Sequence, residues 1–267
     1  MLSNFHIHTD FCDGKSTPEE IVLYAIEKGF DAIGFSGHGY TPYDISYCIK
    51  DMNGYISSVN KLKAKYKNKI QIYLGIEEDS FSLINRNDFD YIIGSCHYFC
   101  VDEKYYPVDL SCDFFKKCLH DFFDDDIIKL SHAYYESFCY YIKKRKPDIV
   151  GHFDLITKFD EWEEQLFLNN DEYLKLSEKY ILEAMKNDVV FEVNTGAISR
   201  GYRHFPYPNE NLLYLLKKND KKVMISSDSH SFDTLDFYFE ETKKILRDIG
   251  FQYAYTIYNN KFIKYSL

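Results

Sequence analysis

Imidazole and carboxylate side chains recur along this chain close to the points where predicted strands end. These groups are the protein ligands that hold borderline divalent metals such as zinc, manganese and iron. Because they follow many different strands, they indicate an open catalytic face rather than a compact structural zinc site. The candidate ligands are His6, His8, Asp13, His38, Glu77, His97, His152, Asp228 and His230.

Two pairs of candidates have the spacing that places both side chains on one face of a strand. Residues two apart in a strand point the same way, so His6 and His8 can bind one metal while the residues beside them pack against the core. Asp228 and His230 repeat this spacing after another apolar segment. Each pair alone is weak evidence, because two ordinary histidines would give the same pattern.

Three further candidates stand alone, and two have a competing structural explanation. Asp13 precedes a glycine and also suits a plain turn. His38 lies between two glycines, which let backbone and ligand approach closely, but it can also be an ordinary loop histidine. Glu77 ends an apolar strand, where its two oxygens can bridge two metals. Glu78 should point to the opposite face, whereas Asp79 shares the face of Glu77 and can support a ligand.

His97 and His152 each follow another predicted apolar strand, so separate histidine groups occur at many strand ends. Such a distribution is hard to obtain by chance, so the set as a whole favours metal binding. The other histidines fit this pattern less well. His120 and His132 fall in predicted helices among aromatic residues, and His204 lies in a loop near two arginines.

Composition narrows the classes of function. The 267-residue chain is 45% hydrophobic and carries a formal net charge of −10. An acidic balance argues against a broad nucleic-acid interface, which needs a basic face. No apolar run is long enough for a membrane span, and no signal peptide is evident at the start. Seven cysteines without a CxxC pair suggest reduced thiols, so we expect a cytoplasmic protein; the oligomeric state stays open.

Short apolar strands alternate with longer helical segments along the chain, which predicts parallel strands joined by helices. We predict strands near residues 2–8, 31–36, 70–76, 90–95, 148–151, 189–194 and 222–226. We predict helices near residues 18–28, 51–67, 112–145 (broken), 171–187, 209–219 and 234–248. Thr17, Pro18 and Glu20 carry start signals for the first helix, and residues 252–258 and 261–265 are typical of a closing hairpin.

About seven β/α units favour a barrel over an open sheet. A barrel brings the C-terminal ends of all its strands to one mouth, whereas an open sheet favours ligands near one switch point. Since the candidate ligands are spread over the whole chain, we predict that residues 1–267 form one barrel domain of the α/β class.

Seven motifs carry the candidate ligands: His6-x-His8, Asp13, Ser36-Gly37-His38, Gly75-x-Glu77, Gly94-Ser95-x-His97, Gly151-His152-x-Asp154 and Ser227-Asp228-x-His230. Together they resemble the polymerase-and-histidinol-phosphatase (PHP) superfamily, and more narrowly the monofunctional histidinol-phosphate phosphatases of bacteria. The resemblance extends from residue 4 to about residue 245. It implies a distorted (β/α)7 barrel with a trinuclear metal site at the C-terminal ends of the strands.

The resemblance also implies a ligand set for each of three divalent ions, which can be zinc, iron or manganese. The first ion would be held by His6, His8, Glu77 and Asp228. The second would be held by Glu77, His97 and His152, so that Glu77 bridges the two. The third would be held by Asp13, His38 and His230.

Substrate contacts are implied in the same way. An arginine after the strand at 189–194 would bind the phosphate, for which a planar guanidinium is suited, and we favour Arg200 over Arg203. Lys158 occupies a position where relatives often have arginine. Lysine can neutralise the charge of a phosphate but cannot donate two parallel hydrogen bonds to it as a guanidinium can. The competing explanation for each is an exposed surface cation.

The implied activity is hydrolysis of L-histidinol phosphate to L-histidinol and phosphate in histidine biosynthesis, by a metal-bound water and without a protein nucleophile. A metal-bound water or Asp79 would protonate the leaving alcohol. One alternative is a PHP phosphoesterase acting on a nucleotide, a nucleic-acid end or phosphotyrosine. Another is a PHP-like binding module that is not an enzyme, although all nine ligand positions are filled here.

Overall fold

The computed structural model describes residues 1–82, 84–161 and 165–267. Seven parallel strands form one sheet in the order β1-β2-β3-β4-β7-β8-β9. They are β1 (Ser3–Asn4), β2 (Ala32–Phe35), β3 (Gln71–Asp79), β4 (Tyr91–Ser95), β7 (Ile149–Val150), β8 (Val190–Asn194) and β9 (Val223–Ser226). The edges of the sheet meet beyond β1 and β9, where the backbone N–H of His8 donates to the carbonyl of Ser229 at 2.8 Å. The sheet is a nearly closed parallel barrel, so the predicted distorted (β/α)7 barrel is confirmed.

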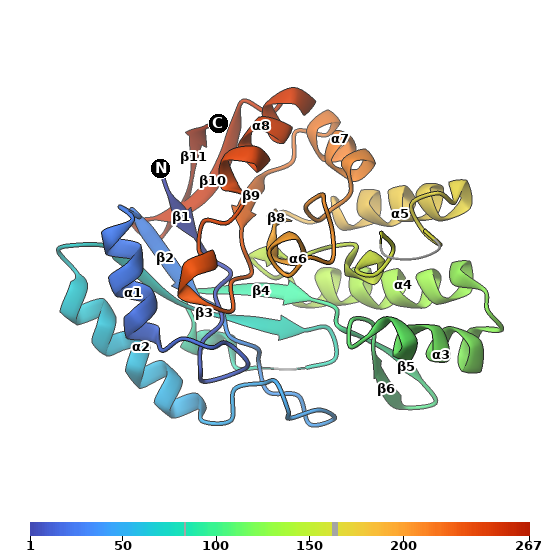
Figure 1. The fold of residues 1–267 in the computed structure, drawn as a ribbon, viewed down its shortest axis with the longest axis horizontal. Coiled ribbons are helices and arrows are strands. Elements are labelled where there is room, and N and C mark those ends of the chain that lie inside the picture. Colours follow the sequence, from blue (N-terminus) through green and yellow to red (C-terminus); the bar gives the residue numbers. More distant parts are fainter. Residues whose placement is uncertain (83, 162–164) are drawn as a thin grey trace.

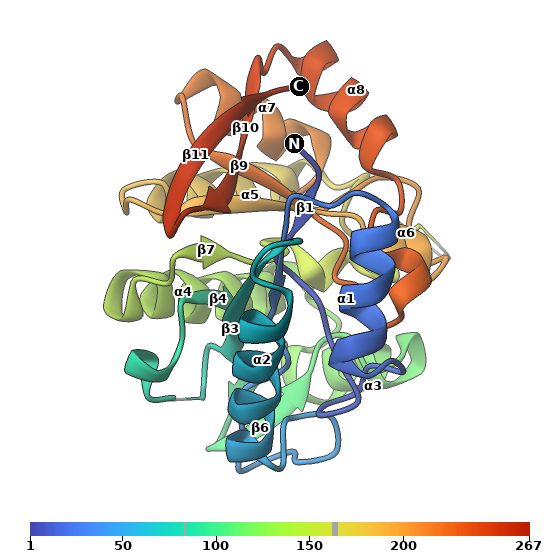
Figure 2. The same ribbon diagram turned by 90° about the vertical axis from the view of Figure 1, so that its left-hand side faces the viewer.

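Helices cover the outside of this barrel, as Figures 1 and 2 show. They are α1 (Pro18–Glu27), α2 (Met52–Tyr66), α3 (Cys112–Phe123), α4 (Ile127–Arg145), α5 (Asp171–Ala184), α7 (Glu210–Lys218) and α8 (Phe239–Ile249), with the short α6 (Gly196–Ser199) near the barrel mouth. The predicted break inside 112–145 falls between α3 and α4. Within the described ranges, no helix combines the length and apolar character that crossing a membrane requires.

The predicted start of the first helix is also confirmed. The side chain of Thr17 accepts a hydrogen bond from the backbone N–H of Glu20 at 3.3 Å, and Glu20 Oε2 accepts from the N–H of Thr17 at 2.8 Å. This reciprocal capping box, with Pro18 at the first position, satisfies N–H groups that the helix itself leaves unpaired. The helix therefore starts at a fixed point and sets the length of the loop from β1 that contains Asp13.

One tyrosine fills the centre of the barrel. Tyr91 is 2% exposed, and its hydroxyl donates to the carbonyl of Phe5 at 2.7 Å. Its ring needs two glycines, because a Cβ on Gly75 would lie 2.2 Å from Tyr91 Cζ and one on Gly34 would lie 2.4 Å from the hydroxyl. Apolar side chains from the other strands close this layer, so the polar side chains above it belong to the C-terminal mouth of the barrel.

In the described part of the chain, two hairpins lie outside the barrel sheet. The predicted one, β10 (Tyr253–Tyr258) with β11 (Lys261–Ser266), packs at the N-terminal end, where Thr256 Oγ1 lies 2.7 Å from Ser3 Oγ. The other, β5 (Tyr98–Val101) with β6 (Lys104–Pro107), directly follows β4 and was not predicted. Its turn uses Asp102 and Glu103 with φ of 48° and 62° instead of the Asn-Gly or Asp-Gly pairs that usually mark such hairpins.

Candidate metal centre

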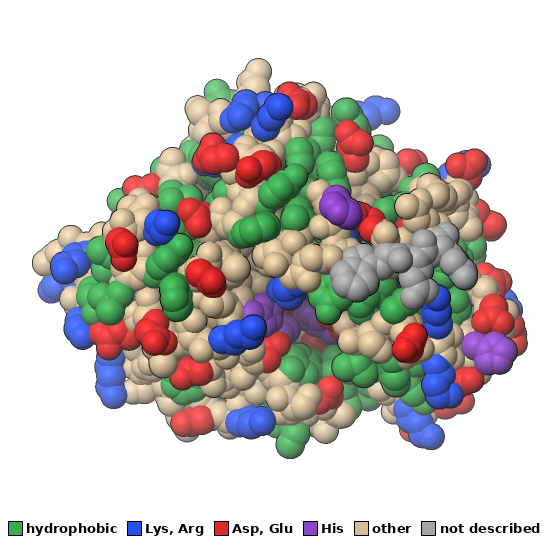
Figure 3. Space-filling view, in the orientation of Figure 1, with side chains coloured by type: hydrophobic (Ala, Val, Ile, Leu, Met, Phe, Trp, Pro, Cys, Tyr) green, Lys and Arg blue, Asp and Glu red, His purple; other side chains and the backbone are tan. Residues whose placement is uncertain are grey.

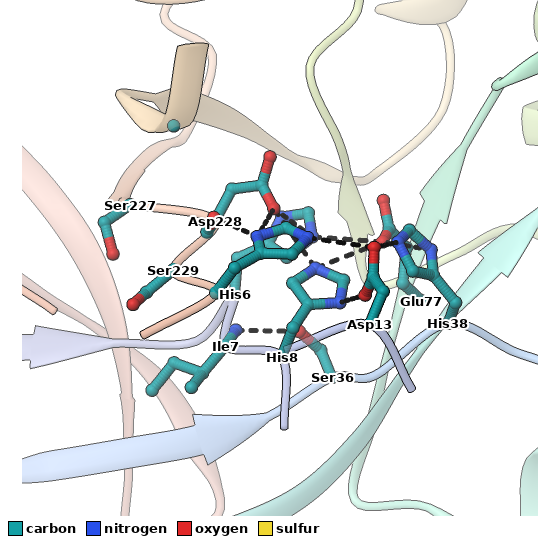
Figure 4. A network of polar contacts seen from close by, with 12 residues as sticks. His6, Ile7, His8, Asp13, Ser36, His38, Glu77, Ser227, Asp228 and Ser229 are labelled. Atoms are coloured by element: carbon teal, nitrogen blue, oxygen red, sulfur yellow. Dashed lines mark hydrogen bonds and ion pairs between the residues drawn. The ribbon is translucent and has the colours of Figure 1, made fainter. Parts of the chain in front are cut away.

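The nine predicted ligands converge at the C-terminal mouth of the barrel. They come from the ends of β1, β2, β3, β4, β7 and β9 and from the loop between β1 and α1. Figure 4 shows six of them, whose side chains point toward one another: His6, His8, Asp13, His38, Glu77 and Asp228. Residues up to 224 positions apart in the sequence (6 to 230) therefore meet in one cluster because parallel strands bring their C-terminal ends to one edge.

Glu77 lies at the centre of the cluster and is 1% exposed. Its Oε2 lies 3.0 Å from His38 Nδ1 and 3.2 Å from His6 Nε2. Its Oε1 lies 3.2 Å from His152 Nε2 and 3.5 Å from His97 Nε2. Oε2 also lies 3.6 Å from His8 Nε2. The two carboxylate oxygens thus face different sets of imidazoles, an arrangement that suits a carboxylate bridging two cations.

Two more carboxylates face the remaining imidazoles. Asp228 Oδ1 lies 3.1 Å from His8 Nε2, and Asp13 Oδ2 lies 3.2 Å from His230 Nε2. Among the described residues there are four sets of donor atoms that can each hold a cation, and the atoms of each set lie within 4.8 Å of one another. The sets are His8, Asp13, His38 and His230; His6, His8 and Asp228; His6, Glu77 and His152; and His38, Glu77 and His97. All nine predicted ligands belong to at least one set.

Several buried donor atoms in this cluster have no hydrogen bond to any residue that the structure describes. Among them are His6 Nε2, His8 Nε2 and Glu77 Oε2. An unsatisfied buried polar atom costs about 1–3 kcal/mol, so three in one place are unusual for a structural cluster. Divalent cations would satisfy them, since nitrogen and oxygen donors of these types are the ligands of zinc, iron and manganese. The residues present therefore fit a metal centre.

Burial and neighbouring charges shift the pKa values of the ligands in different directions. Burial raises the pKa of Glu77, but the surrounding imidazoles outweigh it and hold that pKa well below the usual range. Burial opposes the charge of Asp228 as well, and Arg200 is the main group that keeps its pKa low. Burial and neighbouring imidazoles lower the pKa of His8 to about 3, which leaves a neutral ring ready to bind metal. For His38, burial is outweighed by the carboxylates, chiefly Glu77, which raise the pKa to about 9.

Glu192, in the middle of β8, was not among the predicted site residues. It is 2% exposed, its Oε1 lies 2.5 Å from His6 Nδ1, and its Oε2 accepts a hydrogen bond from the N–H of His152 at 2.8 Å. The partner of the second imidazole nitrogen decides which nitrogen faces a metal, so Glu192 directs His6 Nε2 into the cluster. The sequence feature that could have identified Glu192 as a site residue is the presence of an acidic residue inside the apolar segment 189–193.

The two acidic residues after Glu77 point to opposite faces, as predicted. Asp79 Oδ2 lies 3.3 Å from His97 Nδ1 and accepts from the N–H of His97 at 2.9 Å. The hydroxyl of Tyr43 donates to its other oxygen at 2.7 Å. Glu78 points toward α4, where Arg145 Nη2 lies 2.6 Å from its Oε1. Asp79 is thus engaged in holding a candidate ligand.

A cavity of about 340 Å³ opens beside the cluster, and Arg200 and Lys158 both line it. Arg200 Nη2 lies 2.9 Å from Asp228 Oδ2, and Lys158 Nζ donates to the carbonyl of Asp109 at 2.8 Å. Figure 3 shows histidine side chains at the bottom of a hollow in this face of the molecule. Its volume is in the range of small-molecule sites, so a small ester can reach the metal centre.

Arg203, the weaker candidate for phosphate binding, lies outside this cavity. Its side chain is 2% exposed, its guanidinium lies 4.3 Å from the centroid of the Tyr207 ring, and Nη1 donates to Thr157 Oγ1 at 2.8 Å. It does not line the cavity that Arg200 and Lys158 line. These contacts indicate that Arg203 holds the loops below the cavity together.

The remaining histidines lie outside the donor sets found in the described residues. His120 pairs with Asp125 on the surface, and His132 contacts the hydroxyl of Tyr180 at 2.9 Å. The side chain of His204 is 92% exposed. Of the cysteines near the site, Cys12 Sγ lies 3.6 Å from His8 Nδ1, on the side of that ring away from Glu77.

Comparisons with known proteins agree with this geometry. The family model described as the PHP domain matches residues 4–196. The histidinol-phosphatase of Bacillus subtilis (strain 168) is 24% identical over 260 residues, which are 88% of this chain and 96% of that protein.

Two solved structures share the fold. The crystal structure of HisK from Listeria monocytogenes matches with a TM-score of 0.76 at 22% identity, over 90% of this chain and 99% of that one. The histidinol phosphate phosphatase of Lactococcus lactis subsp. lactis Il1403, in complex with zinc, L-histidinol and phosphate, matches with a TM-score of 0.65 at 20% identity, over 98% of each chain.

Proposed function

The chain belongs to the PHP domain family, and from this premise we propose that it is a metal-dependent phosphomonoesterase that hydrolyses L-histidinol phosphate to L-histidinol and phosphate. The observation that carries the proposal is the convergence of nine ligand side chains around Glu77, beside a cavity lined by Arg200 and Lys158. The choice of ester is supported by the relatives, since the Bacillus subtilis protein is named histidinol-phosphatase and the Lactococcus lactis structure contains L-histidinol and phosphate.

We propose three divalent ions, of zinc, iron or manganese, with the ligand sets that the family resemblance implies. His6, His8, Glu77 and Asp228 would hold one, Glu77, His97 and His152 a second, and Asp13, His38 and His230 a third. The grouping of Asp13, His38 and His230 within one donor set supports the third site. Glu77 lies with one oxygen near His152 and His97 and the other near His6 and His8, which supports its bridging position. When bound, such ions activate water as a nucleophile and polarise the phosphoryl oxygens.

The protein's own residues then bind and orient the ester. The Arg200 guanidinium lines the cavity while its Nη1 and Nη2 donate to the carbonyl and the carboxylate of Asp228. Its charge and its remaining N–H groups are what phosphoryl oxygens would meet there. Lys158, which is paired with Asp109, adds a second positive charge to the pocket lining. Asp79 is held by Tyr43 and by His97, so we assign it to orienting His97 rather than to protonating the leaving alcohol.

A small ester fits this site better than a nucleic-acid end. The cavity has small-molecule dimensions, and the net charge of −10 would repel a polyanion. We therefore propose a cytoplasmic enzyme of histidine biosynthesis, formed as one domain by residues 1–267.

Phosphate release tests this function. L-histidinol phosphate, p-nitrophenyl phosphate, phosphotyrosine and a short 5′-phosphorylated DNA are offered to protein of known metal content, before and after chelation. The proposal requires chelator-sensitive turnover with a strong preference for L-histidinol phosphate. Faster turnover of another ester would support the metal centre but reject L-histidinol phosphate as the substrate. Protein that binds metal without hydrolysing any ester would support the alternative of a binding module that is not an enzyme.

A further inference from the structure

The unpredicted hairpin after β4 forms one wall of the cavity. Tyr98, Pro107, Asp109 and Leu110 all line it, and all belong to the hairpin or to the loop between the hairpin and α3. The backbone N–H of Val108 donates to the carbonyl of His97 at 2.8 Å. This hydrogen bond fixes the wall next to a candidate metal ligand, so residue 109 has a defined place beside the centre.

Asp109 is a carboxylate of this wall that is not a metal ligand. Its side chain is 25% exposed and its Oδ2 lies 3.2 Å from Lys158 Nζ. Burial would raise its pKa, but Lys158 and then His97 keep the pKa below its usual value, so the carboxylate stays charged at neutral pH. Asp44 is another such carboxylate in the lining, but it is held by Tyr98 and Ser46 and lacks this link to the metal ligands.

A negative charge at this position opposes the binding of a phosphate group. Asp109 offsets part of the charge of Lys158, which the proposed function needs for the phosphoryl oxygens. For a phosphatase of general specificity, this carboxylate would only weaken substrate binding. It becomes favourable if the substrate carries a cation close to its phosphate, because an unpaired ammonium beside metal ions and Arg200 would be repelled.

We propose that Asp109 binds the ammonium group of the substrate and thereby selects phosphate esters of amino alcohols over esters that lack the amine. This inference rests on the proposed function. In L-histidinol phosphate the amine is attached to the carbon next to the ester carbon, so it lies close to the phosphate. Asp109 is likewise adjacent to Lys158, the phosphate-binding cation, and Tyr98 and Tyr202 supply aromatic surface for the rest of the molecule.

The test compares Asp109→Asn with the wild-type enzyme on three esters: L-histidinol phosphate, the corresponding imidazolylpropyl phosphate without the amine, and p-nitrophenyl phosphate. Loss of a charged hydrogen bond should lower kcat/KM for L-histidinol phosphate about 10- to 100-fold, mainly through KM. The two esters without the amine should change by less than about threefold. The inhibition constant of L-histidinol should rise together with KM, and Asp109→Glu should recover part of the preference.

A matched control is Asp188→Asn, which breaks a surface aspartate–lysine pair of 2.9 Å with Lys222 away from the cavity. It should leave kcat/KM for all three esters unchanged. Metal content and thermal unfolding of both variants show whether the metal centre and the fold are intact. If folded, metal-loaded Asp109→Asn loses activity equally on all three esters, or keeps the wild-type preference, the proposal is overturned.

Failure of the proposed function can be recognised separately. If the wild-type enzyme does not hydrolyse L-histidinol phosphate, 2-aminoethyl phosphate and ethyl phosphate replace the first two esters. A preference for the aminated ester that disappears in Asp109→Asn supports the role of Asp109 and rejects only the substrate. Absence of any preference in the wild-type enzyme overturns the role of Asp109.

Discussion

Oε1 of Glu192 lies 2.5 Å from Nδ1 of His6, and both side chains are buried. The other oxygen of Glu192 accepts from the backbone N–H of His152 at 2.8 Å. One carboxylate on β8 therefore fixes the ring of a ligand from β1 and the backbone of a ligand after β7. Since the orientation of ligand imidazoles controls metal affinity, Glu192 supports the centre without facing its cations.

Glu192→Gln should lower metal affinity about 10- to 100-fold, because the neutral amide no longer favours the imidazole with its hydrogen on Nδ1. The measurement is competition of the metal-free protein with a chromophoric chelator, and activity should recover as metal is added in excess. Glu240→Gln, which alters a surface pair with Lys243, is the control and should bind metal like the wild-type protein. Equal affinity in both variants would exclude this role for Glu192.

Asp228→Asn should reduce turnover at least about 100-fold through loss of metal. The carboxylate faces His8 at 3.1 Å and Arg200 at 2.9 Å, so the amide removes a negative charge from both neighbours. Metal analysis and turnover are measured on the same preparation. Near-normal activity would remove Asp228 from the ligand set.

Arg200→Lys should impair phosphate binding, whereas Arg203→Lys should impair the stability of the fold. Arg200 lines the cavity, so the loss of its fork should weaken phosphate inhibition and lower kcat/KM by about 10- to 100-fold. Arg203 is buried against Tyr207, so its replacement should lower the unfolding temperature more than it changes KM. Inhibition by inorganic phosphate and thermal unfolding of both variants separate the two effects, and the reverse pattern would exchange the two roles.

Metal affinity should rise with pH. The pKa of His38 in the metal-free protein is raised to about 9 by Glu77 and Asp13 against the effect of burial, so near neutral pH this ring is protonated. A cation must displace that proton, and the apparent affinity should fall up to about tenfold for each pH unit below 9 per proton released. Calorimetric titrations in two buffers of different ionisation enthalpy count the protons. Binding that releases none and is independent of pH would contradict this account.

The alternation of strands and helices could be predicted because the strands are compact apolar segments and the helices have periodic apolar positions, as in residues 18–28. The spread of the candidate ligands over the whole chain then favoured a barrel over an open sheet. The sequence could not supply the direction of every polar side chain. Glu192 stands in an apolar strand, but only the closure of the barrel shows that it faces His6. Arg200 and Arg203 are three residues apart, and the turn at Gly201, with φ of 75°, sends one to the cavity and the other into the interior.

The position of the hairpin wall that carries Asp109 could not be predicted from the sequence for another reason. In the β5–β6 hairpin two adjacent residues, Tyr98 and Phe99, are buried and the other positions are exposed or half-buried, so neither strand alternates clearly. Its turn residues Asp102 and Glu103 have positive φ and are not the pairs that usually mark such turns. Its position over the cavity depends on the contact between Val108 and His97, which joins segments on either side of the hairpin. The pattern of residue types in this segment therefore gave no reason to place Asp109 beside Lys158.

The most direct test of the central claim is kcat/KM for L-histidinol phosphate, measured against p-nitrophenyl phosphate on chelated protein and again after reloading with zinc or manganese. The account predicts that chelation abolishes hydrolysis, that reloading restores it, and that L-histidinol phosphate is much preferred over p-nitrophenyl phosphate. Hydrolysis that survives complete removal of metal would contradict it, and so would metal-loaded protein that leaves L-histidinol phosphate intact.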